Sequence, residues 1–326
     1  MFKDKLQNIS SAVKEDLKTF NDIFHQSMKS KVALIDLIVR YLLRQKGKKI
    51  RPLLVLLSAK ISGNINERTH RGAVLVELLH TATLIHDDVV DNAEKRRNFW
   101  SLNKVFKNKV SVLMGDYLLA RGLMLAVENK DYDFLEIITG AVKRMSEGEL
   151  LQIQKTRKLD IDEETYFQVI SDKTASLIET CCIIGAMSTS VNSKFLSALK
   201  EYGFNLGISF QIKDDILDYE GQSFLLGKPI GGDIKEKKIT LPLIYSLNNV
   251  PKEKSNKIRK LLKNQNDKSV IKEIINFVKE NRGIEYSYTI SKKYADKAKK
   301  SLEVFPPSET KIALESLVDF VTERKN

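Results

Sequence analysis

Two aspartate clusters of identical spacing carry most of the chemistry that this sequence suggests. Residues 87–91 read DDVVD and residues 214–218 read DDILD, so both are DDxxD motifs with apolar residues in the middle. Residues four apart are neighbours on one face of a helix, so the outer two carboxylates of each motif would point the same way and need a cation between them. Oxygen ligands without His or Cys suit Mg²⁺, which keeps some waters and shares phosphate oxygens. The candidate metal ligands are Asp87, Asp88, Asp91, Asp214, Asp215 and Asp218.

Basic residues accompany both motifs and could bind anions. The segment KKIRP at 48–52 opens the helix before the first motif, where the helix N-terminus attracts negative charge. Two arginines follow that motif, and the segment 221–242 after the second motif combines glycines with lysines, as in a loop that closes over phosphates. Neither GxxxxGK[ST] nor GxGxxG occurs, so these are not the usual nucleotide loops. The basic candidates are Lys48, Arg51, Arg96, Arg97, Lys228 and Lys238.

The composition predicts long helices around these motifs. Only 15 Gly and 6 Pro among 326 residues leave few turns, which argues against many short strands. Hydrophobic residues at 42% and charged residues at 29% exclude a disordered chain. We therefore expect one all-α domain covering residues 1–326. Helix breaks are expected at 63–64, 92–103, 129–133, 158–162, 192–193, 221–232, 248–252 and 306–307.

The net charge of +12 indicates an anionic partner, which could be nucleic acid, anionic lipid or a phosphorylated small molecule. The basic stretch 251–270 has no interleaved aromatic residues, so nucleic-acid binding is disfavoured. Cys181 and Cys182 are neighbours and the only cysteines, which excludes a disulfide framework and suits the cytoplasm. No apolar run approaches the ~18 residues of a transmembrane segment, and residues 1–20 resemble neither a signal nor a transit peptide.

The chain resembles the trans-isoprenyl diphosphate synthases, also called polyprenyl synthetases. The resemblance covers roughly residues 40–245, with the motifs in the family's order and spacing. One departure is Lys46-Gly47-Lys48-Lys49, where the family usually has Gly-Gly-Lys-Arg. The motifs that carry the resemblance are GKKIRP at 47–52, LLHTATLIHDDVVDNAEKRRN at 78–98, GDYLLARG at 115–122, EGELLQ at 147–152, DKTASL at 172–177, and FQIKDDILD with GKPIGGDIKEKKITLP at 210–242.

The resemblance implies a helical bundle of the isoprenoid synthase type around a deep central cavity. It implies Mg²⁺, three ions per active site, and head-to-tail condensation of an allylic diphosphate with isopentenyl diphosphate. In this family the allylic diphosphate leaves, the resulting cation is attacked by the double bond of isopentenyl diphosphate, and a proton is lost to the released diphosphate. A homodimer that does not bind nucleic acid is expected. Transient membrane association is expected when the hydrophobic product leaves.

The resemblance also assigns roles to residues of this chain. The six aspartates would bind Mg²⁺, with Asp88 assisting the outer pair of the first motif. His80 lies two turns before Asp87 on the same helical face, whereas His86 would face elsewhere and be structural. The allylic diphosphate would be bound by Arg96, Lys173, Lys228 and Lys238, isopentenyl diphosphate by Lys48, Arg51, His80 and Arg97, and the catalytic group would be Lys173, Thr174 and Gln211.

Residues before the first motif bear on product length. In this family large rings one or two turns before the motif block chain growth, and here the positions are Leu79, Ala82 and Thr83, none of them aromatic. The small Ala82 favours a medium or long polyprenyl diphosphate, of the kind used as a quinone side chain, with geranylgeranyl diphosphate as the alternative. A facing helix near Met114, Leu118 or Met124 would form the cavity floor.

Other classes remain in view. A terpene cyclase would usually carry an Asn/Ser/Glu motif instead of the second DDxxD, and a head-to-head synthase would not need the Lys48, Arg51 and His80 site. A non-catalytic subunit of a heteromeric synthase typically lacks one or both aspartate motifs, whereas this chain has both. A basic protein that binds nucleic acid or a membrane surface is the interpretation from composition alone.

Overall fold

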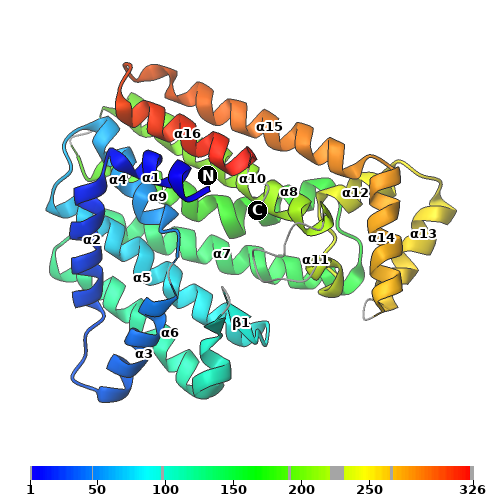
Figure 1. The fold of residues 1–326 in the computed structure, drawn as a ribbon, viewed down its shortest axis with the longest axis horizontal. Coiled ribbons are helices and arrows are strands. Elements are labelled where there is room, and N and C mark those ends of the chain that lie inside the picture. Colours follow the sequence, from blue (N-terminus) through cyan, green and yellow to red (C-terminus); the bar gives the residue numbers. More distant parts are fainter. Residues whose placement is uncertain are drawn as a thin grey trace. The chain divides into compact units, whose positions relative to one another are not determined.

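The computed structural model describes residues 2–45, 47–96, 99–189, 192–220, 231–264 and 267–323. Nearly all of these residues are helical, which confirms the predicted all-α class (Figure 1). The described part of the chain contains just two strands, β1 (Lys95–Arg96) and β2 (Phe99–Trp100), which pair antiparallel. The sequence indicated an irregular segment here.

The helix ends agree with most of the predicted breaks. The helix end at Leu261 was not predicted. The next helix begins at Lys268 with an ordinary N-cap, since Asp267 accepts a hydrogen bond from the backbone N–H of Ser269 (2.8 Å). The helices are α1 (Phe2–Ser11), α2 (Lys14–Ser27), α3 (Ala33–Arg44), α4 (Ile50–Ser62), α5 (Glu67–Val90), α6 (Leu102–Glu128), α7 (Tyr132–Lys158), α8 (Glu163–Ile170), the π-helical η1 (Ser171–Ala175), α9 (Ser176–Met187), α10 (Ser193–Glu220), α11 (Gly232–Lys235), α12 (Leu241–Asn248), α13 (Lys252–Leu261), the 3₁₀ turns η3 (Leu262–Asn264) and η4 (Leu302–Val304), α14 (Lys268–Glu280), α15 (Gly283–Ser301) and α16 (Glu309–Glu323).

The chain divides into two compact units. Unit 1 comprises residues 1–140, 180–200 and 304–314, and unit 2 comprises residues 141–179, 201–303 and 315–326. The first aspartate motif belongs to unit 1 and the second to unit 2. The expectation that residues 1–326 form a single domain stays a prediction.

The first motif lies at the C-terminal end of α5, the central helix of unit 1. This helix begins with a capping box, in which Asn66 accepts from the N–H of Thr69 (3.0 Å) and Thr69 Oγ1 accepts from the N–H of Asn66 (3.2 Å). Further along, α5 packs against α2, α4 and α6 (Figure 1). Its apolar residues are therefore buried on most sides, and the helix forms a rigid support for the motif.

Within the described residues α6 is the one helix long and apolar enough to cross a membrane, judged by length and composition alone. Met114, Gly115 and Leu118 are buried inside unit 1, as in a core helix. The opposite side exposes apolar residues, including Leu113 and Met124. The helix thus has one face packed within unit 1 and one apolar face that the described residues leave exposed.

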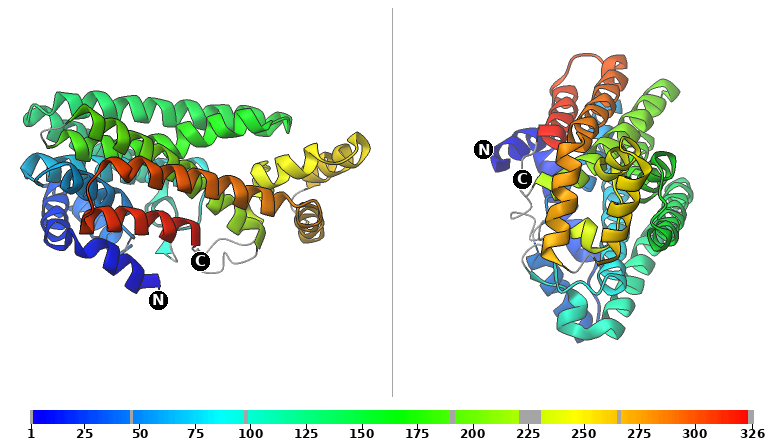
Figure 2. Two further views of the ribbon diagram at one scale, coloured as in Figure 1. Left: turned by 90° about the horizontal axis from the view of Figure 1, so that it is seen from above. Right: turned by 90° about the vertical axis from the view of Figure 1, so that its right-hand side faces the viewer.

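The second motif lies at the C-terminal end of α10. Ile208, Ile212 and Ile216 recur every four residues and are buried in the hydrophobic core of unit 2, so one stripe of α10 is anchored. The adjoining stripe carries Gln211 and the three aspartates of the motif, Asp214, Asp215 and Asp218. In the same unit, α12, α13 and α14 gather beside the N-terminal part of α15 (Figures 1 and 2).

Candidate active site

The outer aspartates of the first motif lie one helical turn apart. The N–H of Asp91 donates to the carbonyl oxygen of Asp87 (2.8 Å), so the helical turn is complete through the last aspartate although α5 ends at Val90. Asp87 is half-buried and Asp91 is exposed. Both carboxylates therefore leave the same side of the helix end, as the spacing predicts.

The middle aspartate of this motif has a different environment. Asp88 is only 4% exposed, and its two carboxylate oxygens accept hydrogen bonds from Arg96 Nε (2.9 Å each), with Nη2 2.8 Å from Oδ1. Arg96 comes from β1, so the short hairpin supplies the positive charge that a buried carboxylate needs. The role of Arg96 toward a diphosphate stays a prediction.

His86, directly before the motif, packs onto α6. Its Nε2 lies 3.3 Å from the carbonyl oxygen of Val112 and 3.3 Å from a carboxylate oxygen of Asp116, so this nitrogen carries the proton because both neighbours are acceptors. A Cβ added to Gly115 would lie only 2.3 Å from His86 Nε2. The glycine of the GDYLLARG motif therefore makes room for the imidazole.

We expect Gly115→Ala to reduce the free energy of unfolding by about 1–3 kcal/mol, because the new methyl group displaces the His86 ring. Gly122→Ala is the matched control on the same helix, since its Cβ would meet Leu75 and Leu78 at 3.5 and 3.6 Å. The control variant should have the same free energy of unfolding as the unmodified protein or one higher by up to about 1 kcal/mol, because alanine has a higher helix propensity than glycine. Urea unfolding measures both, and equal effects of the two substitutions would contradict the prediction.

The remaining candidates of unit 1 are distributed over α4 and α5. Lys48 is exposed before α4 and Arg51 is half-buried in its first turn. His80 is buried, at 8% exposure, and its carbonyl oxygen accepts from the hydroxyl of Thr83 (2.9 Å). The chain-length candidates Leu79 and Ala82 are buried on α5. Arg97 lies outside the described residues.

In the second motif, Asp215 is buried at 4% exposure and held by two donors. Tyr166 Oη donates to Oδ2 (2.6 Å) and Gln211 Nε2 donates to Oδ1 (2.8 Å). Burial raises the pKa of Asp215 well above its usual value, and the negative charge of Asp233 adds to the shift, whereas the two donors oppose it. Asp214 is half-buried.

The last aspartate of this motif contacts the backbone that follows it. Asp218 Oδ1 accepts from the N–H of Gly232 (3.0 Å), and Oδ2 accepts from the N–H of Asp233 (3.1 Å). Asp218 is half-buried. The chain at 231–233 is thereby attached to the motif.

Lys173 and Thr174 lie on the π-helical segment Ser171–Ala175, a kind of helix distortion that is frequent at functional sites. Lys173 Nζ donates to Gln152 Oε1 (2.9 Å) and pairs with Glu149. Thr174 Oγ1 donates to Gln211 Oε1 (2.8 Å), which connects this segment to α10. The structure thus brings Thr174 and Gln211 into contact, whereas the Lys173 amine contacts two residues of α7.

Sequence reasoning gave no role to several residues that hold this site. Glu149 and Gln152 belong to the EGELLQ motif, which could have indicated a partner for Lys173. Lys213, 3% exposed, donates to the hydroxyl of Tyr288 (3.0 Å) and lies over its ring. The position of Lys213 directly before two aspartates could have indicated that it belongs to the site. The sequence around Tyr166 contains no comparable indication.

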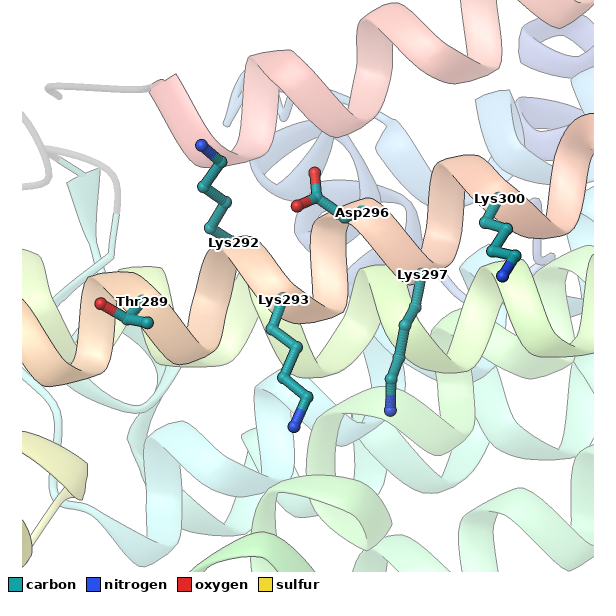
Figure 3. A pocket seen from close by; sticks show the side chains of 6 residues that line it. All are labelled: Thr289, Lys292, Lys293, Asp296, Lys297 and Lys300. Atoms are coloured by element: carbon teal, nitrogen blue, oxygen red, sulfur yellow. The ribbon is translucent and has the colours of Figure 1, made fainter.

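The basic candidates after the second motif are only partly visible. Lys238 is half-buried and pairs with Glu236, whereas Lys228 lies outside the described residues. One open depression in unit 2 lies on α15 and contains no motif residue (Figure 3). Lys293 and Lys297 point to one side of that helix and Lys292 to the other, so the lysines do not converge on a ligand.

The donor set fits a magnesium ion better than a transition metal. Within the described ranges, no three His, Cys, Asp or Glu side chains form a closed metal cluster. Mg²⁺ does not need one, since it uses one or two carboxylates and takes its remaining ligands from water and substrate phosphates. The outer aspartates of each motif supply such carboxylates, without nitrogen or sulfur ligands.

Comparison with known proteins identifies the family of this chain. The polyprenyl synthetase family model matches residues 32–278. The octaprenyl diphosphate synthase of Escherichia coli (strain K12) is 32% identical over 98% of this chain and 99% of its own length. The geranylgeranyl diphosphate synthase of Saccharolobus solfataricus is 34% identical over 86% of this chain and 87% of its own.

A solved structure shows the same fold. The polyprenyl synthase of Caulobacter crescentus CB15, crystallised with calcium and isoprenyl diphosphate, superimposes with a TM-score of 0.92 at 33% identity. The match covers 98% of each chain.

Proposed function

Because this chain belongs to the polyprenyl synthetase family and is a prenyltransferase, we propose that its two aspartate motifs hold the diphosphate substrates for head-to-tail chain elongation. The product is a polyprenyl diphosphate longer than farnesyl diphosphate. The observation that carries the proposal is the presence of both DDxxD motifs at helix ends, with their outer carboxylates oriented alike. The similarity to synthases of octaprenyl and geranylgeranyl diphosphate supports it.

The proposed metal ligands are the outer aspartates, Asp87 and Asp91 in the first motif and Asp214 and Asp218 in the second. Three Mg²⁺ per active site is the number that the family resemblance suggests. Bound Mg²⁺ would offset the negative charge of the departing diphosphate. The carboxylates themselves would fix where the diphosphate oxygens lie before the reaction.

The basic residues would orient the two substrates. We assign Lys48, Arg51 and His80, together with Arg97, to the diphosphate of isopentenyl diphosphate. Lys173, which Glu149 and Gln152 orient, would donate to the allylic diphosphate as its charge rises. Such fixed donors stabilise developing charge without reorganisation. Arg96, Lys228 and Lys238 are assigned to the same diphosphate.

Thr174 and Gln211 would line the place where the allylic carbon becomes positively charged. In the reaction the allylic C–O bond breaks, and its electron pair leaves with the diphosphate. The double bond of isopentenyl diphosphate then forms the new C–C bond, and a proton passes to the released diphosphate. The side chains hold and orient the two substrates and exclude water from them. No side-chain nucleophile is required.

We propose a medium or long product, of the kind used as a quinone side chain. The small, buried Ala82 near the first motif supports this length because it leaves room for a growing chain. The alternative is geranylgeranyl diphosphate, which the similarity to the archaeal synthase favours. A non-catalytic subunit is a different class, and the presence of both motifs argues against it.

We also propose that the protein is a homodimer formed through α6. After the kink at Lys107, the exposed face of this helix carries Leu113, Met124 and Val127, an apolar stripe that a second copy could cover. We expect the enzyme in the cytoplasm, with transient membrane association during product release.

The test is incubation of the purified protein with Mg²⁺, labelled isopentenyl diphosphate and farnesyl diphosphate, followed by separation of products by chain length. We expect a ladder that ends beyond twenty carbons. A single twenty-carbon product would support the geranylgeranyl alternative. No incorporation with any allylic primer would contradict the proposal and favour the partner-dependent subunit.

A further inference from the structure

A continuous chain of hydrogen bonds runs through the second motif and ends at Thr174. Tyr166 Oη donates to one oxygen of Asp215 (2.6 Å), and Gln211 Nε2 donates to the other (2.8 Å). The carbonyl end of the same amide, Gln211 Oε1, accepts from the hydroxyl of Thr174 (2.8 Å). All four residues belong to unit 2, and Tyr166 and Asp215 are 3% and 4% exposed.

The direction of these bonds has an electronic consequence. Gln211 Nε2 donates to Asp215 Oδ1, so the NH₂ end of this amide faces Asp215. The carbonyl end of Gln211 must then face Thr174, whose O–H is used as the donor. The lone pairs of Thr174 Oγ1 consequently point away from Gln211. A positive charge that faces these lone pairs is stabilised by them.

The environment of Asp215 also differs from that of the other two aspartates of the second motif. Its side chain is buried and its two oxygens accept from the side chains of Tyr166 and Gln211. Asp214 and Asp218 are both half-buried, and the donors to Asp218 are the backbone N–H groups of residues 232 and 233. Asp88 in the first motif is buried in the same manner, with Arg96 as its donor. The middle aspartate of each motif is thus bound to protein.

We propose that Tyr166 is a positioning residue of the second motif. Together with Asp215, which orients side chains and binds no metal, it fixes the amide of Gln211 so that the hydroxyl oxygen of Thr174 faces the developing allylic cation. The inference rests on the proposed prenyl transfer and extends it to residues to which the resemblance gave no role or a metal-binding role.

The first test is Tyr166→Phe, which removes one donor and keeps the buried ring. We expect kcat to fall about 10- to 100-fold, the usual effect of losing a residue that orients a catalytic group, with KM for isopentenyl diphosphate within about threefold. Tyr286→Phe is the matched control, since its hydroxyl also donates to a carboxylate of unit 2, Glu163 (2.7 Å), outside the network. The control should keep full activity.

The second test is Asp215→Asn compared with Asp214→Asn. An asparagine at 215 can donate to Gln211 Oε1 and so invert the amide, which turns the Thr174 hydrogen toward the cation. We expect a loss in kcat of about 100-fold or more, the size seen when one preorganised dipole is lost. Calorimetry with Mg²⁺ and inorganic pyrophosphate should show Asp215→Asn within about threefold of the unmodified affinity and Asp214→Asn at least about tenfold weaker.

The outcomes separate the inference from the proposed function. An active unmodified enzyme with an unaffected Tyr166→Phe, or equal losses of pyrophosphate affinity in the two aspartate variants, would overturn the positioning role alone. A loss of kcat in Tyr166→Phe with an equally inactive Tyr286→Phe would also overturn it. An unmodified enzyme without prenyl transfer would overturn the proposed function and, with it, this role of Tyr166.

Discussion

Asp87→Asn and Asp214→Asn are each expected to lower kcat/KM for prenyl transfer at least about a thousandfold. Each substitution keeps the side-chain volume and removes one carboxylate of the outer pair of a motif. The diphosphate would then lose an anchoring charge that matters most when its own negative charge is largest, so the loss falls mainly on kcat. Labelled isopentenyl diphosphate incorporation at several Mg²⁺ concentrations measures it.

These substitutions should leave the fold intact. Removing one of two like charges on a helical turn relieves repulsion, so the free energy of unfolding should stay the same or rise slightly. Asp296→Asn is the matched control, because Asp296 is exposed on α15 outside both motifs. Full turnover in either motif variant would rule out the metal-binding mechanism, and lost turnover in the control would show that the effect is unspecific.

The second large effect is expected for Ala82→Phe, which should shorten the product by one or more isoprene units. Ala82 lies on α5 five residues before Asp87 and is 2% exposed, so a phenyl ring there must occupy space close to the motif. If the chain grows past this position, the ring blocks it while the first condensations still proceed. Product separation by chain length reads the result directly.

Ala73→Phe provides the matched control for this prediction. Ala73 is buried on the same helix, but nine residues away, which places it on the opposite face. Both variants should lose about 1–3 kcal/mol of stability through overpacking, so only the product length distinguishes them. Leucine at each position is the substitute if phenylalanine prevents folding. An unchanged ladder in Ala82→Phe or Ala82→Leu would remove this residue from the chain-length positions.

Much of the helical layout could be predicted from sequence because the signals are local. The expected breaks at 129–133 and 158–162 match the ends of α6 and α7, since Asn, Asp and Lys clusters interrupt apolar periodicity where a helix stops. The hairpin β1–β2 was missed, as its strands have two residues each and no alternation to detect. The π-helical segment at 171–175 was missed because helix type there depends on packing.

Packing at the π-helical segment 171–175 shows why this part of the structure could not be predicted from the sequence. A Cβ on Gly207 would lie 2.5 Å from the Cα of Ala175, so α10 and the π-helical turn approach more closely than any other residue would allow. The close approach is what places Thr174 within reach of Gln211. No spacing rule along the chain contains this information, because the two residues meet only after folding.

The sequence by itself determined the all-helical class, the two aspartate motifs and the pairing of their outer carboxylates, because these depend on residue type and on neighbours one helical turn away. Only the tertiary structure decided what the middle aspartates do. Asp215 is held by Tyr166, which is 49 residues away in the chain, and Asp88 by Arg96 from the hairpin. Burial and hydrogen-bond donors come from whichever elements pack nearby, so identical DDxxD letters acquire different roles in the folded chain.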